Sequence, residues 1–369
     1  MRSFFHTGES SIIDRAFPVP IFLDMPVAGL DISESVIRYI EFGGKGGKRF
    51  VKNFGEQRLP KGAIEGGYIN QPEEVIKALI AIRRKTGVYF VNVSLPEEKA
   101  YLFKAEMPRL EGQELRDAIA FRIEENVPVA SKDAIFDFSV LREKEKKSEH
   151  IDVIVSVIPS KVSETYASVV KNAGLMPRSF EIVSQAVARA AAPRADDEGS
   201  YLIMNFGETK TGLAIVSHGI VFFTSTISLG SSVLDEMVAS TYSISSQKVP
   251  ELKAEITSSG KQDMKSFLSV MESENVIPLK EEIAKLALYW KTHGVKFLGK
   301  PTTVDKIILC GKDMALPAVD EYFSTSTGIK AEIANVWHNI FSFDDYIPPI
   351  SYREGLDYAG AIGLAVSYV

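Results

Sequence analysis

The chain has 369 residues, of which 45% are apolar, and its formal net charge is −6. This length exceeds the size at which a single hydrophobic core keeps growing, so we expect two or more domains. The charge gives no support for nucleic-acid binding, which favours a basic patch. The single cysteine, Cys310, excludes an intrachain disulfide and fits a reducing compartment.

Residues 1–26 are interpreted as an N-terminal tail. Acidic residues interrupt its apolar part and no small-residue cleavage site follows, so it does not match a signal peptide. Within it, Ile12–Phe17 can lie against a partner or a membrane surface, although a loosely ordered tail is the simpler interpretation. The sequence contains no run of the ~18–20 apolar residues that a membrane span needs.

The next segment predicts a strand, a polar turn and two further strands. The expected strands are Val27–Asp31, Val36–Phe42 and Arg49–Phe54. The glycine-rich segment 43–48 lacks the spacing of a phosphate loop and is interpreted as a hairpin tip. Pro72 then begins a helix that buries Val75, Leu79 and Ile82 and stops before Gly87, and Tyr89–Leu95 is a strand.

The next segment has a different predicted pattern of strands and helices, and we expect it to be an α+β subdomain inserted into the first lobe. Its predicted order is strand, helix, strand, strand, helix. These elements are Tyr101–Met107, Glu111–Asn126, Ile135–Leu141, Ile151–Ile158 and Ser163–Ala173. The charged segment 142–150 is interpreted as a solvated hairpin loop.

The remaining chain repeats the first pattern. After a helix at Phe180–Ala192 and a polar linker at 193–200, the strands Tyr201–Met204, Gly212–Val216 and Ile220–Ile227 surround the turn Asn205–Thr211. The later elements are helices at Ser232–Tyr242 and Met264–His293, a strand at Thr303–Cys310, a helix at Leu316–Thr327, a strand at Ala331–Ala334 and a helix at Leu356–Val366.

The two strand–turn–strand–strand units suggest an internal duplication that forms two facing lobes. Each polar turn can then offer amide and hydroxyl donors to one phosphate chain between the lobes. Two ordinary β-meanders are the alternative. The histidines show no metal-ligand spacing and no nucleophile elbow is present, so a nucleotide site is the chemistry that the pattern favours.

The candidate nucleotide site takes residues from both units. Asp31 can hold a hydrated Mg²⁺, which prefers one or two carboxylates and several waters. Arg38 can reach a phosphate or lie on the outer face of its strand, and Glu282 with Lys285 can frame a ribose or form a surface ion pair. The full set is Asp31, Ser33, Ser35, Arg38, Asn205, Gly207, Thr209, Lys210, Thr211, Gly230, Glu282, Lys285 and Gly311.

Several segments resemble, in order along the chain, those of the PilM family of type IV pilus assembly proteins. They are Pro18–Met25 with Gly29–Ser33, Leu59–Gly67, Glu114–Pro128, Phe180–Ala190, Asn205–Gly230 and Leu309–Pro317. The FtsA family of cell-division proteins shares the general plan, and the segments at 59–67 and 114–128 favour the pilus family. An FtsA-like protein would carry a C-terminal amphipathic helix, which the sequence at 363–369 does not suggest.

The resemblance implies an α/β, actin/Hsp70-like fold of two duplicated lobes with an inserted α+β subdomain in the first. Its implied divisions are a tail at 1–26, the first lobe at 27–93 and 178–192, the insert at 94–177, and the second lobe at 193–369 with a helical part within about 232–300.

It also implies ATP and Mg²⁺ between the lobes, and a principal partner in the N-terminal cytosolic peptide of PilN. That peptide would dock between the insert and the rest of the first lobe, and the strands Tyr101–Met107 and Ile135–Leu141 are candidates for contacting it. Phe103, Phe136 and Phe138 on these strands can instead be core residues. The protein would be a cytoplasmic scaffold held at the inner face of the cytoplasmic membrane by the pilus inner-membrane complex, with pilus motor or platform proteins as further partners.

The sequence departs from the family pattern at the expected nucleotide contacts. Ser33 replaces a glycine, Arg38 replaces a lysine, and Asn205 replaces an aspartate that lies near the metal. Lys312 and Asp313 follow Gly311 where consecutive glycines are usual, and Glu181 replaces an aspartate. We therefore expect slow or absent hydrolysis, with Asp31 and Glu181 as the only catalytic candidates; a nucleotide-switched ATPase is the alternative.

Overall fold

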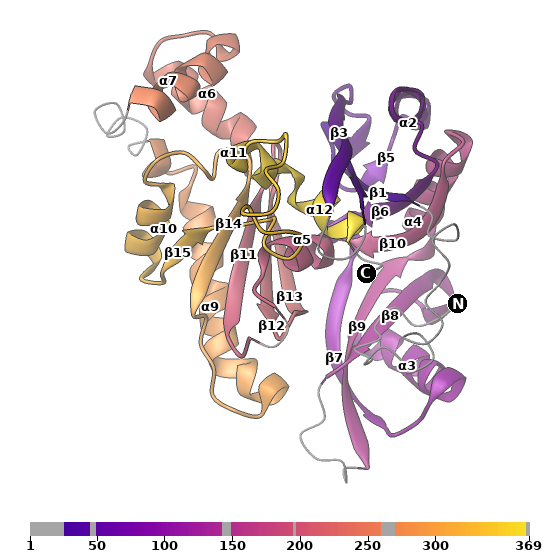
Figure 1. The fold of residues 1–369 in the computed structure, drawn as a ribbon. Coiled ribbons are helices and arrows are strands. Elements are labelled where there is room, and N and C mark those ends of the chain that lie inside the picture. Colours follow the sequence, from indigo (N-terminus) through magenta and orange to yellow (C-terminus); the bar gives the residue numbers. More distant parts are fainter. Residues whose placement is uncertain (1–25, 45–48, 142–148, 195–196, 260–269, 367–369) are drawn as a thin grey trace.

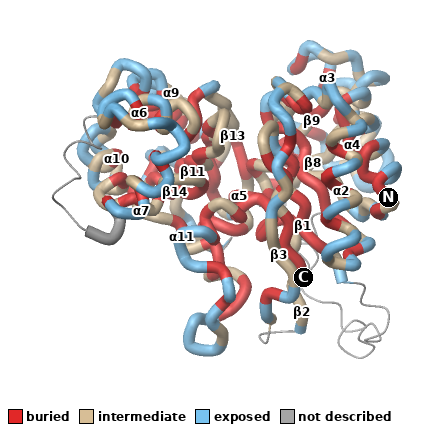
Figure 2. Tube along the Cα trace, turned by 90° about the horizontal axis from the view of Figure 1, so that it is seen from above, coloured by how far each residue is buried: buried red, intermediate tan, exposed pale blue. Residues whose placement is uncertain are grey.

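The computed structural model describes residues 26–44, 49–141, 149–194, 197–259 and 270–366, and they form two lobes (Figure 1). A five-stranded sheet lies at the centre of each lobe. Seen from above, buried segments run through both sheets and through the helix α5 between them (Figure 2). The predicted pair of facing lobes is confirmed.

The first sheet has the strand order β10-β6-β1-β2-β3. Its strands β1, β2 and β3 form an antiparallel meander, while β6 runs parallel to β1 and β10 runs parallel to β6. The bounds are β1 Val27–Ile32, β2 Val36–Gly43, β3 Phe50–Arg58, β6 Phe90–Leu95 and β10 Met176–Ile182.

The second sheet repeats this plan with the order β13-β12-β11-β14-β15. Here β11, β12 and β13 form the antiparallel meander, and β14 and β15 follow in parallel. The bounds are β11 Ser200–Phe206, β12 Thr211–Ser217, β13 Ile220–Ile227, β14 Lys306–Gly311 and β15 Ala331–Ile333. The shared topology confirms the duplication predicted from the turns.

Two helices pack on the first sheet, α2 Pro72–Thr86 and α4 Ser160–Asn172. Proline at the first turn and Gly87 in the left-handed conformation bound α2, as the sequence predicts. A short hairpin of β4 Ile64–Glu65 and β5 Tyr68–Ile69 precedes this helix. We expected α4 to belong to the insert, but its buried residues pack in the core of the first sheet.

The inserted module is a three-stranded antiparallel sheet of order β7-β9-β8 with one helix on its face. Its elements are β7 Tyr101–Pro108, α3 Gly112–Asn126, β8 Ala134–Val140 and β9 His150–Pro159. The predicted stripe Leu115, Ile119 and Ile123 is buried against the sheet. Phe103, Phe136 and Phe138 pack against the same core, which favours their structural interpretation.

The second lobe carries α6 Ser231–Thr241, α7 Val249–Ser259, α9 Ile277–Leu298 and α10 Val319–Thr327. The helix expected at Met264–His293 lies partly outside the described residues, and its described part begins later and extends to Leu298. None of the described helices is both long enough and apolar enough to cross a bilayer.

Two helices cross between the lobes, α5 Val183–Ala191 and α12 Ala359–Ala365, and α11 Tyr352–Gly355 precedes α12 (Figure 1). Glycine permits this crossing, because a Cβ on Gly363 would lie 1.7 Å from the carbonyl oxygen of Ala186. The sequence predicted one helix from Phe180, but Phe180–Ile182 extend β10 and only the residues from Val183 are helical. The connection is therefore a strand that leads directly into the helix between the lobes.

Candidate functional site

The polar turns of the two lobes face each other across one cleft. Asp31, Ser33, Ser35 and Arg38 line it from the first lobe. The second lobe contributes Asn205, Gly207, Thr209, Lys210 and Gly311. Equivalent strand ends of the two duplicated sheets thus supply nine of the residues that the sequence selected.

The first turn is closed by its own hydrogen bonds. The backbone N–H of Ser33 donates to the Val36 carbonyl at 3.0 Å and its hydroxyl donates to the same oxygen at 2.7 Å. Asp31 pairs in register with Arg38 on the neighbouring strand. Burial raises the pKa of Asp31, while a hydrogen bond with Ser94 and the charge of Arg38 lower it. The serine hydroxyl is therefore already engaged within the turn.

Arg38 is held by carboxylates. Its guanidinium lies 3.4 Å from Glu56 and 3.7 Å from Asp357, and its side chain is largely buried. Burial raises the pKa of Asp357 to about 6, the charge of Arg38 lowers it, and Asp313 raises it. Arg38 thus balances negative charge that belongs to the protein.

The second turn is also tightly connected. The backbone N–H of Gly207 donates to the Lys210 carbonyl at 2.8 Å, and the first amide of α6 donates back to Gly207 at 3.0 Å. A Cβ on Gly230 would meet the Glu208 carbonyl at 2.4 Å, so this glycine lets the helix approach the turn. Thr211 is buried and its hydroxyl donates to the Leu229 carbonyl at 2.6 Å. Gly230 and Thr211 support the turn and do not line the cleft.

The structure places three other selected residues away from this cleft. Glu282 accepts from the Ser225 hydroxyl at 2.7 Å and pairs with Lys285 at 3.2 Å on α9, as in the surface-pair alternative. Glu181 on β10 forms an ion pair with Arg189 of α5.

Six carboxylates and three cationic side chains line the cleft. The acidic members are Asp31, Glu34, Glu97, Glu98, Glu208 and Asp357, and the cationic members are Arg38, Lys210 and Lys312. Sequence reasoning missed most of the acidic members, although Glu34 and Glu208 lie inside the two turns that it selected. Glu34 pairs with Lys210 and Glu208 pairs with Arg58, and each partner is too distant in the sequence for a local pattern to reveal the pairing.

A magnesium triphosphate does not fit this arrangement. The cleft has a volume of about 130 Å³, below the ~300–1,000 Å³ of ordinary ligand sites. Burial opposes ionisation, but hydrogen bonds and nearby cations lower the pKa of Glu34 and of Glu208, so these two carboxylates are ionised and would repel phosphate oxygens. Asp31 lines the cleft at a strand end and could hold a hydrated Mg²⁺ only together with the phosphates, because the described residues contain no group of three side chains placed to bind a metal ion.

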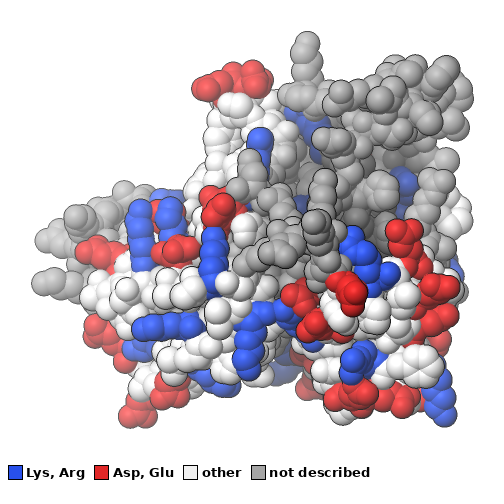
Figure 3. Space-filling view, turned by 90° about the horizontal axis from the view of Figure 1, so that it is seen from below, with Lys and Arg blue, Asp and Glu red and all other residues white. Residues whose placement is uncertain are grey.

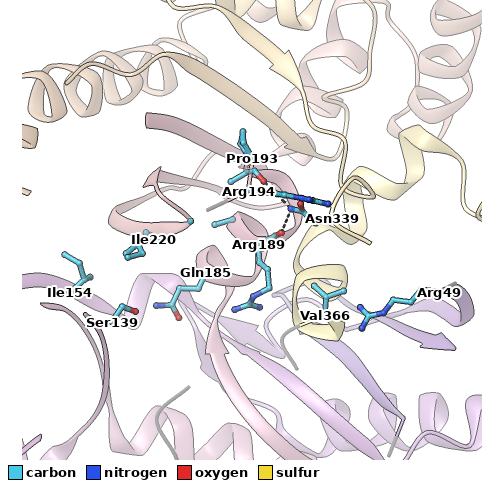
Figure 4. Close-up of a pocket in the computed structure, with 14 residues that line it drawn as sticks. Arg49, Ser139, Ile154, Gln185, Arg189, Pro193, Arg194, Ile220, Asn339 and Val366 are labelled. Carbon is cyan, nitrogen blue, oxygen red and sulfur yellow. Dashed lines mark hydrogen bonds between the residues drawn. The ribbon is translucent and has the colours of Figure 1, made fainter. Parts of the chain in front are cut away.

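A second hollow, of about 330 Å³, lies between the inserted module, α5 and the second lobe. Figure 4 shows Ser139 and Ile154 on the module facing Gln185 and Arg189 of α5. On the face of the molecule in Figure 3, basic and acidic side chains are interspersed, so this face has no field of a single sign.

The comparisons with known proteins agree with this architecture. A family model described as type IV pilus assembly protein PilM matches residues 29–368. A solved structure described as the PilM-PilN type IV pilus biogenesis complex is 17% identical with a TM-score of 0.72, covering 92% of this chain and 97% of that one. The ethanolamine utilization protein EutJ of Carboxydothermus hydrogenoformans is 14% identical with a TM-score of 0.53, covering 95% of this chain and 91% of its own. These likenesses confirm the predicted actin-like α/β fold.

Proposed function

Because this chain belongs to the PilM family of type IV pilus assembly proteins, we propose that it is a scaffold of the pilus inner-membrane assembly complex. We propose further that it binds the N-terminal cytosolic peptide of a PilN-like membrane protein. The observation that carries this proposal is the preformed hollow between the inserted module, α5 and the second lobe, which is a different place from the expected groove between the insert and the rest of the first lobe. A cytoplasmic position, peripheral at the inner face of the cytoplasmic membrane, follows from binding such a partner, and motor or platform proteins are further candidates.

The hollow has two walls that a peptide can contact at the same time. One wall is the face of the small sheet that points away from α3, with Ser139 on β8 and Ile154 on β9. The other is α5, whose Gln185 side chain donates to the Ser156 hydroxyl at 3.0 Å and fixes the spacing of the walls. Its volume lies within the range of ordinary ligand sites.

The lining favours an apolar peptide that also carries oxygen acceptors. Ile154, Ile220 and Val366 supply apolar surface (Figure 4). Arg49 and Arg194 contribute guanidinium groups, which bind carboxylates and peptide carbonyls through several donors. The strand β8 is also an edge of its sheet, and extended peptides add to such edges through main-chain hydrogen bonds.

A titration of the purified full chain with a synthetic PilN N-terminal peptide tests the proposal. We expect the wild-type chain to bind and Ser139→Trp, which fills the hollow from β8, to weaken binding at least tenfold, or about 1.4 kcal/mol. Glu164→Trp, on the exposed face of α4, is the matched control and should bind as the wild type does. No binding by a folded wild-type chain would refute the function, and equal binding by both variants would refute this location.

ATP and Mg²⁺ were implied by the family resemblance, and the cleft residues of this chain do not fit them. The proposed scaffold function therefore contains no nucleotide-dependent step. Asp31 and Asn205 face the cleft from equivalent strand ends, which is the observation that keeps a nucleotide-switched ATPase as the second candidate. A thermal-shift titration with millimolar Mg·ATP separates the two, because a site at a hundred times its Kd gains ~2.7 kcal/mol.

A further inference from the structure

The two duplicated turns carry a glutamate at the same position. Glu34 follows Asp31 by three residues, and Glu208 follows Asn205 by three residues. Each glutamate projects into the cleft between the lobes. Because the halves share one topology, these carboxylates occupy equivalent places on opposite sides of the cleft.

Each glutamate binds a cation of the other lobe. Lys210 of the second lobe places its Nζ 2.5 Å from Oε1 of Glu34 and 2.7 Å from Glu98. In the opposite direction, Arg58 at the end of β3 places its Nη1 2.5 Å from Oε2 of Glu208. We call these five residues the ionic clasp.

The Glu34 carboxylate receives the kinds of donor that a phosphate group receives at such a turn. The backbone N–H of Gly66 donates to its Oε1 at 2.7 Å, and the Lys210 ammonium approaches the same oxygen. Burial opposes its ionisation, but hydrogen bonds from Lys210, Thr209 and Gly66 lower the pKa of Glu34. Burial likewise opposes the charge on Lys210, and Glu34 and Glu98 raise the pKa of that ammonium.

The two halves of the clasp differ in strength. The side chains of Lys210 and Glu34 are 21% and 18% exposed, so water screens their attraction incompletely. Arg58 is 54% exposed, and a pair of that exposure contributes little. The Lys210 half should therefore determine how tightly the lobes are held.

We propose that this clasp closes the cleft with the protein's own charges, the Glu34 carboxylate taking the place of a bound phosphate, so that lobe closure requires no nucleotide. A partly buried hydrogen bond from the Thr226 hydroxyl to Glu97, at 3.3 Å, adds a further contact from β13 to the first lobe. The protein is thus a clamp that is closed in its resting state. None of the five clasp residues lines the peptide hollow.

The distance between the lobes is the direct readout. Spin labels at Lys61→Cys on the first lobe and Lys248→Cys on the second, both exposed positions, report it in the otherwise intact chain, whose own Cys310 is buried. We expect one narrow distance distribution that millimolar Mg·ATP does not change. We also expect no thermal shift with Mg·ATP.

Lys210→Met should increase the open population at least roughly tenfold, since hydrogen bonds between charged groups are lost. Lys300→Met is the matched control, because Lys300 pairs with Glu198 inside the second lobe at 2.9 Å, and it should leave the distribution unchanged. A shorter or narrower distribution on adding Mg·ATP to the wild type would overturn the proposal. An unchanged distribution in Lys210→Met would overturn it as well, and the wild-type measurements decide the matter even if that variant does not fold.

Discussion

Glu97 is the buried carboxyl group whose ionisation we expect to weaken the closed cleft. Thr226 of the second lobe donates to its Oε1 at 3.3 Å. Burial raises the pKa of Glu97 to about 8; the nearby Ser184 and Thr226 hydroxyls lower it, and the charge of Glu98 raises it. Lys210, which lines the same cleft, is engaged by Glu98 and Glu34.

The sign of the pH effect follows from the two pKa values. An unperturbed glutamate titrates near 4.5, whereas Glu97 in the folded chain titrates near 8. Between these values the folded chain keeps a proton that the unfolded chain has lost, so stability falls as the pH rises and becomes level above the folded pKa. One such group changes the free energy of unfolding by ~1.4 kcal/mol per pH unit, and across the window by on the order of 5 kcal/mol.

Glu97→Gln removes this titration while keeping the shape of the side chain. Urea unfolding of both proteins at a series of pH values should show that the free energy of unfolding of the variant increases relative to that of the wild type with each pH unit, up to about pH 8. Glu164→Gln, at an exposed position on α4, should give a curve parallel to that of the wild type. A constant difference between Glu97→Gln and the wild type across the window would refute the reasoning.

Two further substitutions test the packing that positions the cleft. Gly363→Ala brings a Cβ within 1.7 Å of the Ala186 carbonyl oxygen and should lower the free energy of unfolding in urea by about 3 kcal/mol. Gly87→Ala is the control, because a Cβ there meets open space. It should lower the free energy of unfolding by only ~1 kcal/mol, since the backbone is left-handed. Trp290→Ala empties a fully buried site against Phe222 and should cost ~3–5 kcal/mol. Leu288→Ala on the same helix is 62% exposed and should change stability by less than ~0.5 kcal/mol. Equal costs within either pair would contradict the packing argument.

The elements that the sequence predicted well are those with local signals. The helix at Pro72–Thr86 has a proline at its start, a glycine at its end and an apolar stripe between them, and the structure confirms each feature. The strand β10 has no such signal, because the apolar pattern of Phe180–Ile182 continues into the helix α5 with the same spacing. Only pairing with β6 extends these residues, and that pairing is a tertiary interaction.

The candidate site divides in the same way. Asp31 and Asn205 were found because each ends an apolar strand and begins a polar turn, and both face the cleft. The ion-pair partners of Glu34 and Glu208 were not predicted. Lys210 pairs with Glu34 and Arg58 pairs with Glu208, and in both pairs the cation and the glutamate belong to different lobes. These ion pairs depend on how the two lobes pack together, and a single sequence has no local pattern that predicts that packing.

In this duplicated fold, equivalent turns of the two lobes face each other, so charged residues on them can hold the cleft closed without a ligand. A turn that carries a carboxylate repels anions, and a cation of the opposite lobe that hydrogen-bonds to that carboxylate compensates its charge. Glu34 with Lys210 and Glu208 with Arg58 are two such pairs, one in each direction across the cleft. If these ion pairs close the lobes, they also hold the walls of the hollow beside α5 in place without a ligand in the cleft. Peptide affinity should then fall when Lys210 is replaced, although Lys210 does not line that hollow.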